Sequence, residues 1–297
     1  MKKTSLFKQY LLAKEILMMP VAHDPLCAKI IERAGFKVVA CGGYASSAAL
    51  IGAPDVELLT LTEMVDAVWR TADAVELPVF ADGDNGHGNT TNVQRTVKQF
   101  EKAGAASIML EDQVSPKRCG HMSGKHVIPI DEFVAKIKAA VDTRTDQDLT
   151  ILARTDAIAV GGLSEAVERA HRCVEVGADW VFLEAPESIE QMSEIPRLVS
   201  VPTLANMIPG GKTPILPACE LQSIGFAAVI WPNAFTYVYA KLASDLAAEL
   251  LRTGTTAPFH DRMIEFEEFN NLVGLPKIRE TEQQYYAHLE DAHLRGA

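Results

Sequence analysis

Short apolar runs alternate with longer amphipathic segments along most of the chain. Four times a helical pattern ends at a glycine and a β-branched or aromatic run follows: Gly35 precedes 37–40, Gly104 precedes 107–110, Gly177 precedes 180–183 and Gly225 precedes 226–230. Glycine ends a helix readily because it adopts a left-handed conformation without a Cβ clash. The repeat of helix, glycine and buried strand predicts parallel βα units.

Four further strand candidates, at 16–20, 78–81, 150–153 and 202–205, complete a set of eight. Eight alternating units close naturally into an α/β barrel, the (β/α)₈ or TIM barrel. An open doubly wound sheet is the alternative, but no GxGxxG sequence follows the first strand. We therefore predict one (β/α)₈ barrel domain over 1–297.

Helical patterns also flank the predicted barrel. An N-terminal helix is expected within 1–15, and a C-terminal helical extension over 255–297. Apolar residues at helical spacing predict two helices in that extension, over 260–270 and 277–289. They either cap the barrel or pack on a neighbouring subunit.

Charge and cysteine content narrow the class of protein. The 297 residues include 28 Lys and Arg against 39 Asp and Glu, a net charge of −11, which argues against nucleic acid or an anionic membrane as partner. Five cysteines without a CxxC pair favour a reduced compartment. With no apolar signal-peptide core and no run of roughly 18 apolar residues, we expect a cytoplasmic protein.

Polar residues follow the predicted strands, where the active sites of α/β barrels lie. Asp82 and Asp84 follow the third strand and Glu111 follows the fourth. Clustered carboxylates repel one another, and a divalent cation relieves that repulsion. Oxygen ligands without nearby His or Cys suit Mg²⁺, with Mn²⁺ as an alternative. The competing interpretation is a pair of aspartates that cap a loop.

A polar loop over 116–125 follows the fourth strand and carries Cys119 among basic residues. Nearby cations lower the pKa of a thiol and make it a usable proton donor or acceptor. The alternative is a solvated basic loop with an incidental cysteine. Cys27, Cys173 and Cys219 lie in helical patterns, and we expect them to be small core residues.

Arg154 ends the fifth strand. A guanidinium there can hold a substrate carboxylate through two hydrogen bonds, or it can form an ion pair with Glu184 or Asp156, and both can hold together.

The sequence resembles the isocitrate lyase and phosphoenolpyruvate mutase superfamily over most of its length. The resemblance rests on six segments: 81–88 (Ala-Asp-Gly-Asp-Asn-Gly-His-Gly), 110–113, 116–121, 153–157, 182–186 and 204–207. The Lys-Arg-Cys-Gly-His sequence over 117–121 is typical of the lyase branch, in which the cysteine is the general acid. The segments 182–186 and 267–276 look most like the 2,3-dimethylmalate lyase group, with the 2-methylisocitrate lyases also similar.

This resemblance implies a role for each matching residue. Asp82, Asp84 and Glu111 resemble the Mg²⁺ carboxylates, some acting through water, with Asp55 as a further acid behind them. Cys119 resembles the general acid, with His121 and Lys117 tuning its thiol.

The resemblance also assigns residues to the substrate pocket. Gly42 and Gly43 resemble main-chain donors to the substrate carboxylate, Arg154 its side-chain partner, and Glu184 and Asn206 further pocket groups. Cys41 stands where relatives often have Ser or Thr, which is expected to alter a hydrogen bond to substrate.

The function implied is a Mg²⁺-dependent carbon–carbon lyase that cleaves a small 2-hydroxy dicarboxylate, such as 2,3-dimethylmalate, to pyruvate and a carboxylic acid. Thr236 stands where 2-methylisocitrate lyases have an arginine for a third carboxylate, which counts against a tricarboxylate substrate. The alternatives are 2-methylisocitrate lyase, oxaloacetate hydrolase or decarboxylase, and carboxyvinyl-carboxyphosphonate phosphorylmutase. A barrel that only binds a small 2-hydroxy or 2-oxo acid is the alternative from another class. The family's exchange of C-terminal helices between subunits implies a homo-oligomer, with a tetramer favoured.

Overall fold

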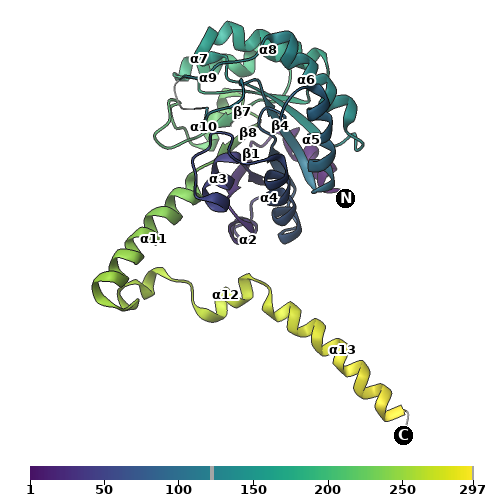
Figure 1. The fold of residues 1–297 in the computed structure, drawn as a ribbon, viewed down its shortest axis with the longest axis vertical. Coiled ribbons are helices and arrows are strands. Elements are labelled where there is room, and N and C mark those ends of the chain that lie inside the picture. The colour runs from purple at the N-terminus through teal and green to yellow at the C-terminus, as the bar shows by residue number, and fades with distance from the viewer. Residues whose placement is uncertain (121–123, 296–297) are drawn as a thin grey trace. The chain divides into compact units, whose positions relative to one another are not determined.

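The computed structural model describes residues 1–120 and 124–295 and shows eight parallel strands surrounded by helices (Figure 1). The strands are β1 (Leu17–Ala22), β2 (Val39–Cys41), β3 (Val79–Asp82), β4 (Ala105–Glu111), β5 (Thr150–Thr155), β6 (Trp180–Leu183), β7 (Leu204–Asn206) and β8 (Ala228–Trp231). Their order is β6-β5-β4-β3-β2-β1-β8-β7. A parallel bridge between Val181 and Thr203 joins β6 to β7 and nearly closes the sheet. The predicted (β/α)₈ barrel and all eight strands are confirmed.

Helices follow the strands as the repeat predicts. They are α1 (Lys3–Leu11), α2 (Pro25–Arg33), α3 (Gly43–Ile51), α4 (Leu61–Ala74), α5 (Thr90–Lys102), α6 (Ile130–Thr143), α7 (Ile158–Gly161), α8 (Leu163–Glu175), α9 (Ile189–Leu198), α10 (Ala218–Ile224) and α11 (Ala234–Thr253). Gly35, Gly104, Gly177 and Gly225 have φ angles of 91°, 93°, 103° and 116°. These angles explain why the helices stop where the glycines predict.

Two apolar layers form the core of the barrel. The larger layer lies between the strands and the surrounding helices, and the smaller one fills the barrel interior. Phe7 of α1 is fully buried in the interior layer, with its ring centroid 6.4 Å from that of Phe80 and 5.7 Å from that of Trp180. The N-terminal helix therefore contributes to the packing of the barrel.

Contacts divide the chain into two compact units, Met1–Val238 and Tyr239–Ala297. The second unit contains η1 (Ala257–Arg262), α12 (Phe266–Leu272) and α13 (Leu275–Arg295). The predicted helix over 260–270 is wrong, because Met263 and Glu265 adopt extended backbone and separate a 3₁₀ turn from a short α-helix. The single-domain boundaries and the exchange of helices between subunits stay predictions. None of the helices in the described part of the chain has the length and apolarity needed to cross a membrane.

Candidate active site

Strand alternation brings polar side chains into the C-terminal end of the barrel. At the ends of four strands, a polar residue stands two positions after an apolar residue of the barrel interior. The pairs are Phe80 and Asp82, Leu152 and Arg154, Phe182 and Glu184, and Leu204 and Asn206. Side chains two residues apart point to the same face of a strand, so these polar groups follow the interior face. All four line one pocket, together with Gly42, Gly43, Asp55, Lys117 and Cys119. The structure thus brings together most of the predicted site residues.

Lys117 joins two buried carboxylates on one side of the pocket. Its Nζ lies 2.6 Å from Asp55 Oδ1 and 2.8 Å from Asp84 Oδ1, and the lysine side chain is 3% exposed. Burial alone would lower the pKa of Lys117, but Asp84, Glu111, Asp55 and Asp82 outweigh it and raise that pKa well above its ordinary value. The ammonium predicted to tune Cys119 therefore stays charged and sits among the predicted metal carboxylates.

Asp82 and Glu111 complete this acidic group. Asp82 accepts hydrogen bonds from the main-chain N–H of Gly43 at 2.9 Å and of Asp84 at 3.1 Å. Glu111 Oε2 lies 3.2 Å from Arg154 Nε, whereas its buried Oε1 finds no hydrogen-bond partner among the described residues. Burial raises the pKa of both Asp82 and Glu111. The buried Glu111 oxygen has no partner, and the raised pKa values show that the negative charge of these carboxylates is poorly compensated. A divalent cation would stabilise that charge.

The acidic group is not a compact three-ligand cage. Among residues 1–120 and 124–295, no three His, Cys, Asp or Glu side chains lie close enough to hold one ion directly. Asp84 and Glu111 are buried behind the pocket lining, whereas Asp82 reaches it. An ion that keeps several water ligands, as Mg²⁺ usually does, suits this spacing.

Arg154 organises the opposite side of the pocket. Its guanidinium lies 3.0 Å from Asp156 and 3.1 Å from Glu184, and it stacks over Phe182 at 5.2 Å from the ring centroid. Burial disfavours the charged arginine, yet Asp156, Glu111 and Glu184 raise its pKa well above the ordinary value. Both predicted ion pairs of Arg154 are therefore present. They hold its positively charged guanidinium in the wall of the pocket.

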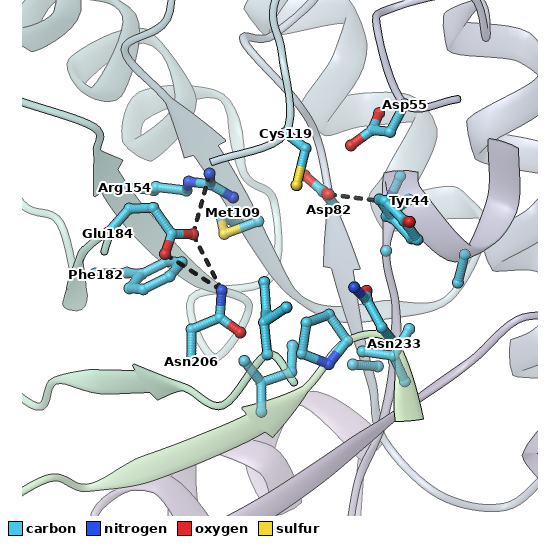
Figure 2. A pocket seen from close by; sticks show the side chains of 18 of the residues that line it. Tyr44, Asp55, Asp82, Met109, Cys119, Arg154, Phe182, Glu184, Asn206 and Asn233 are labelled. Atoms are coloured by element: carbon cyan, nitrogen blue, oxygen red, sulfur yellow. Dashed lines mark hydrogen bonds and ion pairs between the residues drawn. The ribbon is translucent and has the colours of Figure 1, made fainter. Parts of the chain in front are cut away.

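Asn206 supplies a polar atom that faces the pocket. Its Nδ2 donates to Glu184 Oε2 at 3.1 Å, which fixes the orientation of the amide. Figure 2 shows the amide oxygen turned away from Glu184, and this buried Oδ1 has no partner among the described residues. An unsatisfied buried acceptor costs free energy unless a ligand group donates to it.

Cys119 enters the pocket on the connection between β4 and α6. Figure 2 shows its sulfur between the acidic side, with Asp82 and Asp55, and the side of Arg154 and Glu184. Gln113 holds the connection by donating to Arg118 O at 2.8 Å and accepting from Arg118 N at 3.0 Å. The predicted residue His121 lies outside the described residues.

Cys41, Gly42 and Gly43 border the pocket where β2 meets α3. The Cys41 thiol, however, lies 3.8 Å from the Ser46 hydroxyl and belongs to the layer between strands and helices. Burial raises the pKa of Cys41 to about 11, so this thiol stays protonated near neutral pH. Gly43 allows a close approach at the pocket edge, since a Cβ there would lie 3.1 Å from Asp84 Oδ1.

Sequence reasoning missed several residues around the pocket. Asn233 is buried, follows β8 and donates to the Tyr237 hydroxyl at 2.9 Å, and that hydroxyl lies 3.3 Å from the Tyr44 hydroxyl. Its position two residues after the end of β8 could have indicated it. Glu57, which holds the Cys119 connection, gave no comparable signal because it does not end a strand. Lys125 was included in the basic loop over 116–125, but nothing in the sequence indicated its contact with Asp156.

One prediction about the cysteines is wrong. Cys27 and Cys173 are buried, as expected, but Cys219 is exposed. It lies in the first turn of the short helix α10, and only Leu221 of that helix is buried. The structure describes all five cysteines, and none of them is in a disulfide bond.

An eight-stranded barrel with acidic and basic groups facing one another at its C-terminal end has the architecture of a (β/α)₈ barrel enzyme. The family model for phosphoenolpyruvate phosphomutase matches residues 7–251. The 2,3-dimethylmalate lyase of Eubacterium barkeri is 47% identical over 285 residues, covering 96% of this chain and 99% of that protein. The chain belongs to the phosphoenolpyruvate mutase and isocitrate lyase superfamily, and it is a carbon–carbon lyase.

Solved structures agree with this assignment. An oxaloacetate acetylhydrolase in complex with 3,3-difluorooxalacetate superposes with a TM-score of 0.91 at 30% identity, covering 96% of this chain and 97% of that one. A 2,3-dimethylmalate lyase gives a TM-score of 0.90 at 30% identity, with 96% of each chain covered. A phosphonopyruvate hydrolase in complex with oxalate and Mg²⁺ gives 0.87 at 28% identity, covering 96% and 100%.

Proposed function

We propose that this lyase cleaves the C2–C3 bond of a small 2-hydroxy dicarboxylate such as 2,3-dimethylmalate, giving pyruvate and propanoate. The observation that carries the proposal is the placement of the Cys119 sulfur between the acidic group and Arg154 (Figure 2). Such a pocket can hold an acid substrate between its two sides, with the Cys119 thiol placed to deliver a proton to it. The similarity to 2,3-dimethylmalate lyase supports this substrate class.

Asp82, Asp84 and Glu111 are the residues that would hold Mg²⁺, or Mn²⁺, partly through water, with Asp55 behind them. A bound divalent cation supplies positive charge for the substrate carboxylate and its neighbouring oxygen. Arg154 and the main-chain N–H of Gly42 bind carboxylate oxygens, and the N–H of Gly43, which donates to Asp82 in the structure, does so by exchanging that partner for the substrate. Asn206 Oδ1 faces the substrate as a further hydrogen-bond acceptor. Glu184 holds the amide of Asn206 and the guanidinium of Arg154 in place for this work.

Bond cleavage needs one base and one acid. A carboxylate of the acidic group takes the proton of the 2-hydroxyl, and the C2–C3 electron pair moves onto C3 as the C2–O bond becomes a ketone. The charge on C3 spreads into its carboxylate, and Cys119 Sγ–H delivers a proton to C3. Lys117 adds positive charge on the acidic side, and His121 is proposed to tune the thiol.

The cations of the pocket lining argue for two substrate carboxylates rather than three. Among residues 1–120 and 124–295, the basic residues that line the pocket are Lys117, Arg118 and Arg154, which come from the loop after β4 and from β5. The β8 side offers Pro232 and Asn233 instead, with Thr236 one turn further along α11. We also propose a cytoplasmic homotetramer. The five cysteines without a disulfide bond support the compartment, and the exposed apolar residues of α12 and α13 support the assembly.

The test is pyruvate release by the purified protein with Mg²⁺, with 2,3-dimethylmalate and 2-methylisocitrate offered separately. Dimethylmalate should react, and Cys119→Ser should lower its kcat by about 10²–10⁴-fold because the general acid is weakened. Cys219→Ser, at an exposed thiol, is the matched control and should keep wild-type kcat. If Cys119→Ser keeps the wild-type kcat, Cys119 is not the proton donor.

The other outcomes separate the alternatives. Faster pyruvate release from 2-methylisocitrate would mean that the pocket accepts a third carboxylate without an arginine. Oxalate release from oxaloacetate, with no pyruvate from either lyase substrate, would favour the hydrolase. Binding of Mg²⁺ and of an acid without any turnover would favour a barrel that only binds.

A further inference from the structure

The connection that carries Cys119 is held at its base by backbone pairing. Val114 N donates to His126 O at 2.9 Å, and Ile128 N donates to Asp112 O at 2.8 Å. These bonds join the outgoing and returning parts of the connection. They fix its base but not the position of residues 117–119, which reach the pocket.

Glu57 fixes the outgoing part. Its carboxylate accepts hydrogen bonds from the Lys117 main-chain N–H at 2.6 Å and from the Ser115 hydroxyl at 2.9 Å. Asn85 Nδ2 donates to the same carboxylate at 2.9 Å. Because Glu57 lies in the segment between α3 and α4, it ties the start of the connection to a neighbouring part of the barrel rim.

Lys125 fixes the far side of Cys119. Its ammonium donates to the main-chain oxygen of Gly120, the residue after Cys119, and to Asp156 Oδ1 at 2.6 Å. The Lys125 side chain is 2% exposed and that of Asp156 is fully buried. A buried ammonium is tolerated only when charge and hydrogen bonds compensate it, so this lysine is held strongly in one place.

Asp156 is shared between Lys125 and Arg154. Arg154 Nε donates to Asp156 Oδ2 at 3.0 Å, while Lys125 takes Oδ1. Burial would raise the pKa of Asp156, but Arg154 and Lys125 outweigh it and lower that pKa. The carboxylate therefore stays ionised and bridges the Cys119 connection to the pocket arginine.

Gly120 is packed directly against the Arg154–Glu184 pair. A Cβ added at Gly120 would lie 2.6 Å from Glu184 Cγ, which no real contact allows without a shift. The position of the Gly120 main chain is thus set from two directions, by Lys125 and by the Arg154–Glu184 pair. Since Cys119 is its neighbour, the same contacts set where the thiol lies.

We propose that Lys125 is a positioning residue: by holding Gly120 O and sharing Asp156 with Arg154, it fixes the Cys119 thiol relative to the carboxylate-binding side of the pocket. This inference rests on the proposed role of Cys119 as proton donor. Loss of Lys125 should impair proton delivery more than substrate binding, because Arg154 keeps Glu184 and Asp156 as partners. Misplacing a reacting group by about 1 Å can cost roughly 10²-fold.

The test compares Lys125→Met, Lys125→Gln and Lys125→Arg with the control Lys138→Met, which removes an exposed lysine paired with Asp142 on α6. We expect kcat for pyruvate release to fall about 10–100-fold in the Met and Gln variants, with KM changed less than about threefold. Lys125→Arg should recover most of kcat because a guanidinium can donate to both acceptors. Lys138→Met should match wild type.

The second readout does not depend on the substrate. Iodoacetamide labelling of Cys119, measured by peptide mass spectrometry against the exposed Cys219 in the same molecule, is followed from pH 6 to pH 10. The plateau rate at high pH reports access to the ionised thiol, so it separates position from the charge of Lys125. The Cys119/Cys219 ratio at this plateau should rise about fivefold or more in Lys125→Met and Lys125→Gln, and return in Lys125→Arg.

Unchanged kcat and labelling ratio in Lys125→Met and Lys125→Gln would overturn the proposal. Equal losses in all three Lys125 variants, together with a lowered Tm, would also overturn it by showing a purely structural role. If the wild type releases no pyruvate from any substrate, the proposed function fails, whereas the labelling ratio still decides whether Lys125 positions Cys119.

Discussion

Asp112 lies behind the pocket and joins the ends of β4 and β5. It accepts from the Thr155 hydroxyl at 2.6 Å, from the Asp156 main-chain N–H at 2.9 Å and from Arg169 at 3.1 Å. Burial, together with the charge of Asp156, raises the pKa of Asp112 from 3.8 to about 6. This residue therefore supports the position of Asp156 but carries an electrostatic cost when it is ionised.

The pKa of Asp112 predicts a pH dependence of stability. Between about pH 4 and pH 6 the folded protein holds a proton at Asp112 that the unfolded chain has lost. The contribution of this group is complete at low pH, so the free energy of unfolding falls as pH rises through about 6, by up to about 1.4 kcal/mol per pH unit. Asp112→Asn should remove this decrease of the unfolding free energy with rising pH.

Urea unfolding in EDTA at several values from pH 4 to pH 7 measures the effect. The slope of the unfolding free energy against pH should be more positive in Asp112→Asn than in wild type, whatever the absolute stabilities. Asp142→Asn, at an exposed position on α6, is the control. Parallel curves for Asp112→Asn and wild type would show that Asp112 does not titrate in this range.

At the level of elements, the strands were predictable and the contacts of the connecting loops were not. A strand with a glycine before it and a polar residue after it is encoded locally, and alternation then carries residues such as Glu184 and Asn206 into the pocket. Lys117 shows the limit. Its neighbours in sequence suggested contact with Cys119, whereas its long side chain reaches Asp55 and Asp84, which are far away in the sequence.

The same limit applies to Glu57 and Lys125. Their partners are main-chain atoms of Lys117 and Gly120 and the carboxylate of Asp156, and main-chain hydrogen bonds leave no pattern in a sequence. The prediction for the C-terminal segment was wrong for another reason. Apolar spacing over 260–270 predicted one helix, but spacing does not report the extended backbone at Met263 and Glu265.

Helix α1 yields a prediction about stability. Phe7 is fully buried in the barrel interior against Phe80 and Trp180, so Phe7→Ala should leave a cavity that the barrel cannot close. We expect a loss of about 3–5 kcal/mol of unfolding free energy, measured by chemical denaturation. Leu12→Ala, at a residue that is 65% exposed beyond the same helix, should change stability by less than about 0.5 kcal/mol. Similar values for both variants would mean that α1 does not contribute to the interior packing.

At the scale of the whole molecule, the unit Tyr239–Ala297 exposes large apolar side chains within a single chain. Phe266 is 85% exposed, Tyr285 71% and Tyr286 67%, and no side chain of α12 is buried. Exposed apolar groups of this size, close together in sequence, are typical of protein–protein interfaces. Packing of the C-terminal helices on a neighbouring subunit, rather than on the barrel, stays a prediction.

That prediction can be tested through assembly alone. Sedimentation velocity of the wild type should give a homo-oligomer, with a tetramer expected, and Phe266→Glu should shift it towards smaller species because a charge would be buried at the interface. Glu267→Gln is the matched control, since it changes a neighbouring charge on α12 and should leave the assembly unchanged. If Phe266→Glu sediments as wild type does, Phe266 lies outside any interface. Every residue proposed above for substrate or metal binding belongs to the unit Met1–Val238. A wild-type monomer that releases pyruvate would therefore show that this unit needs no second chain for activity, and it would contradict the predicted tetramer.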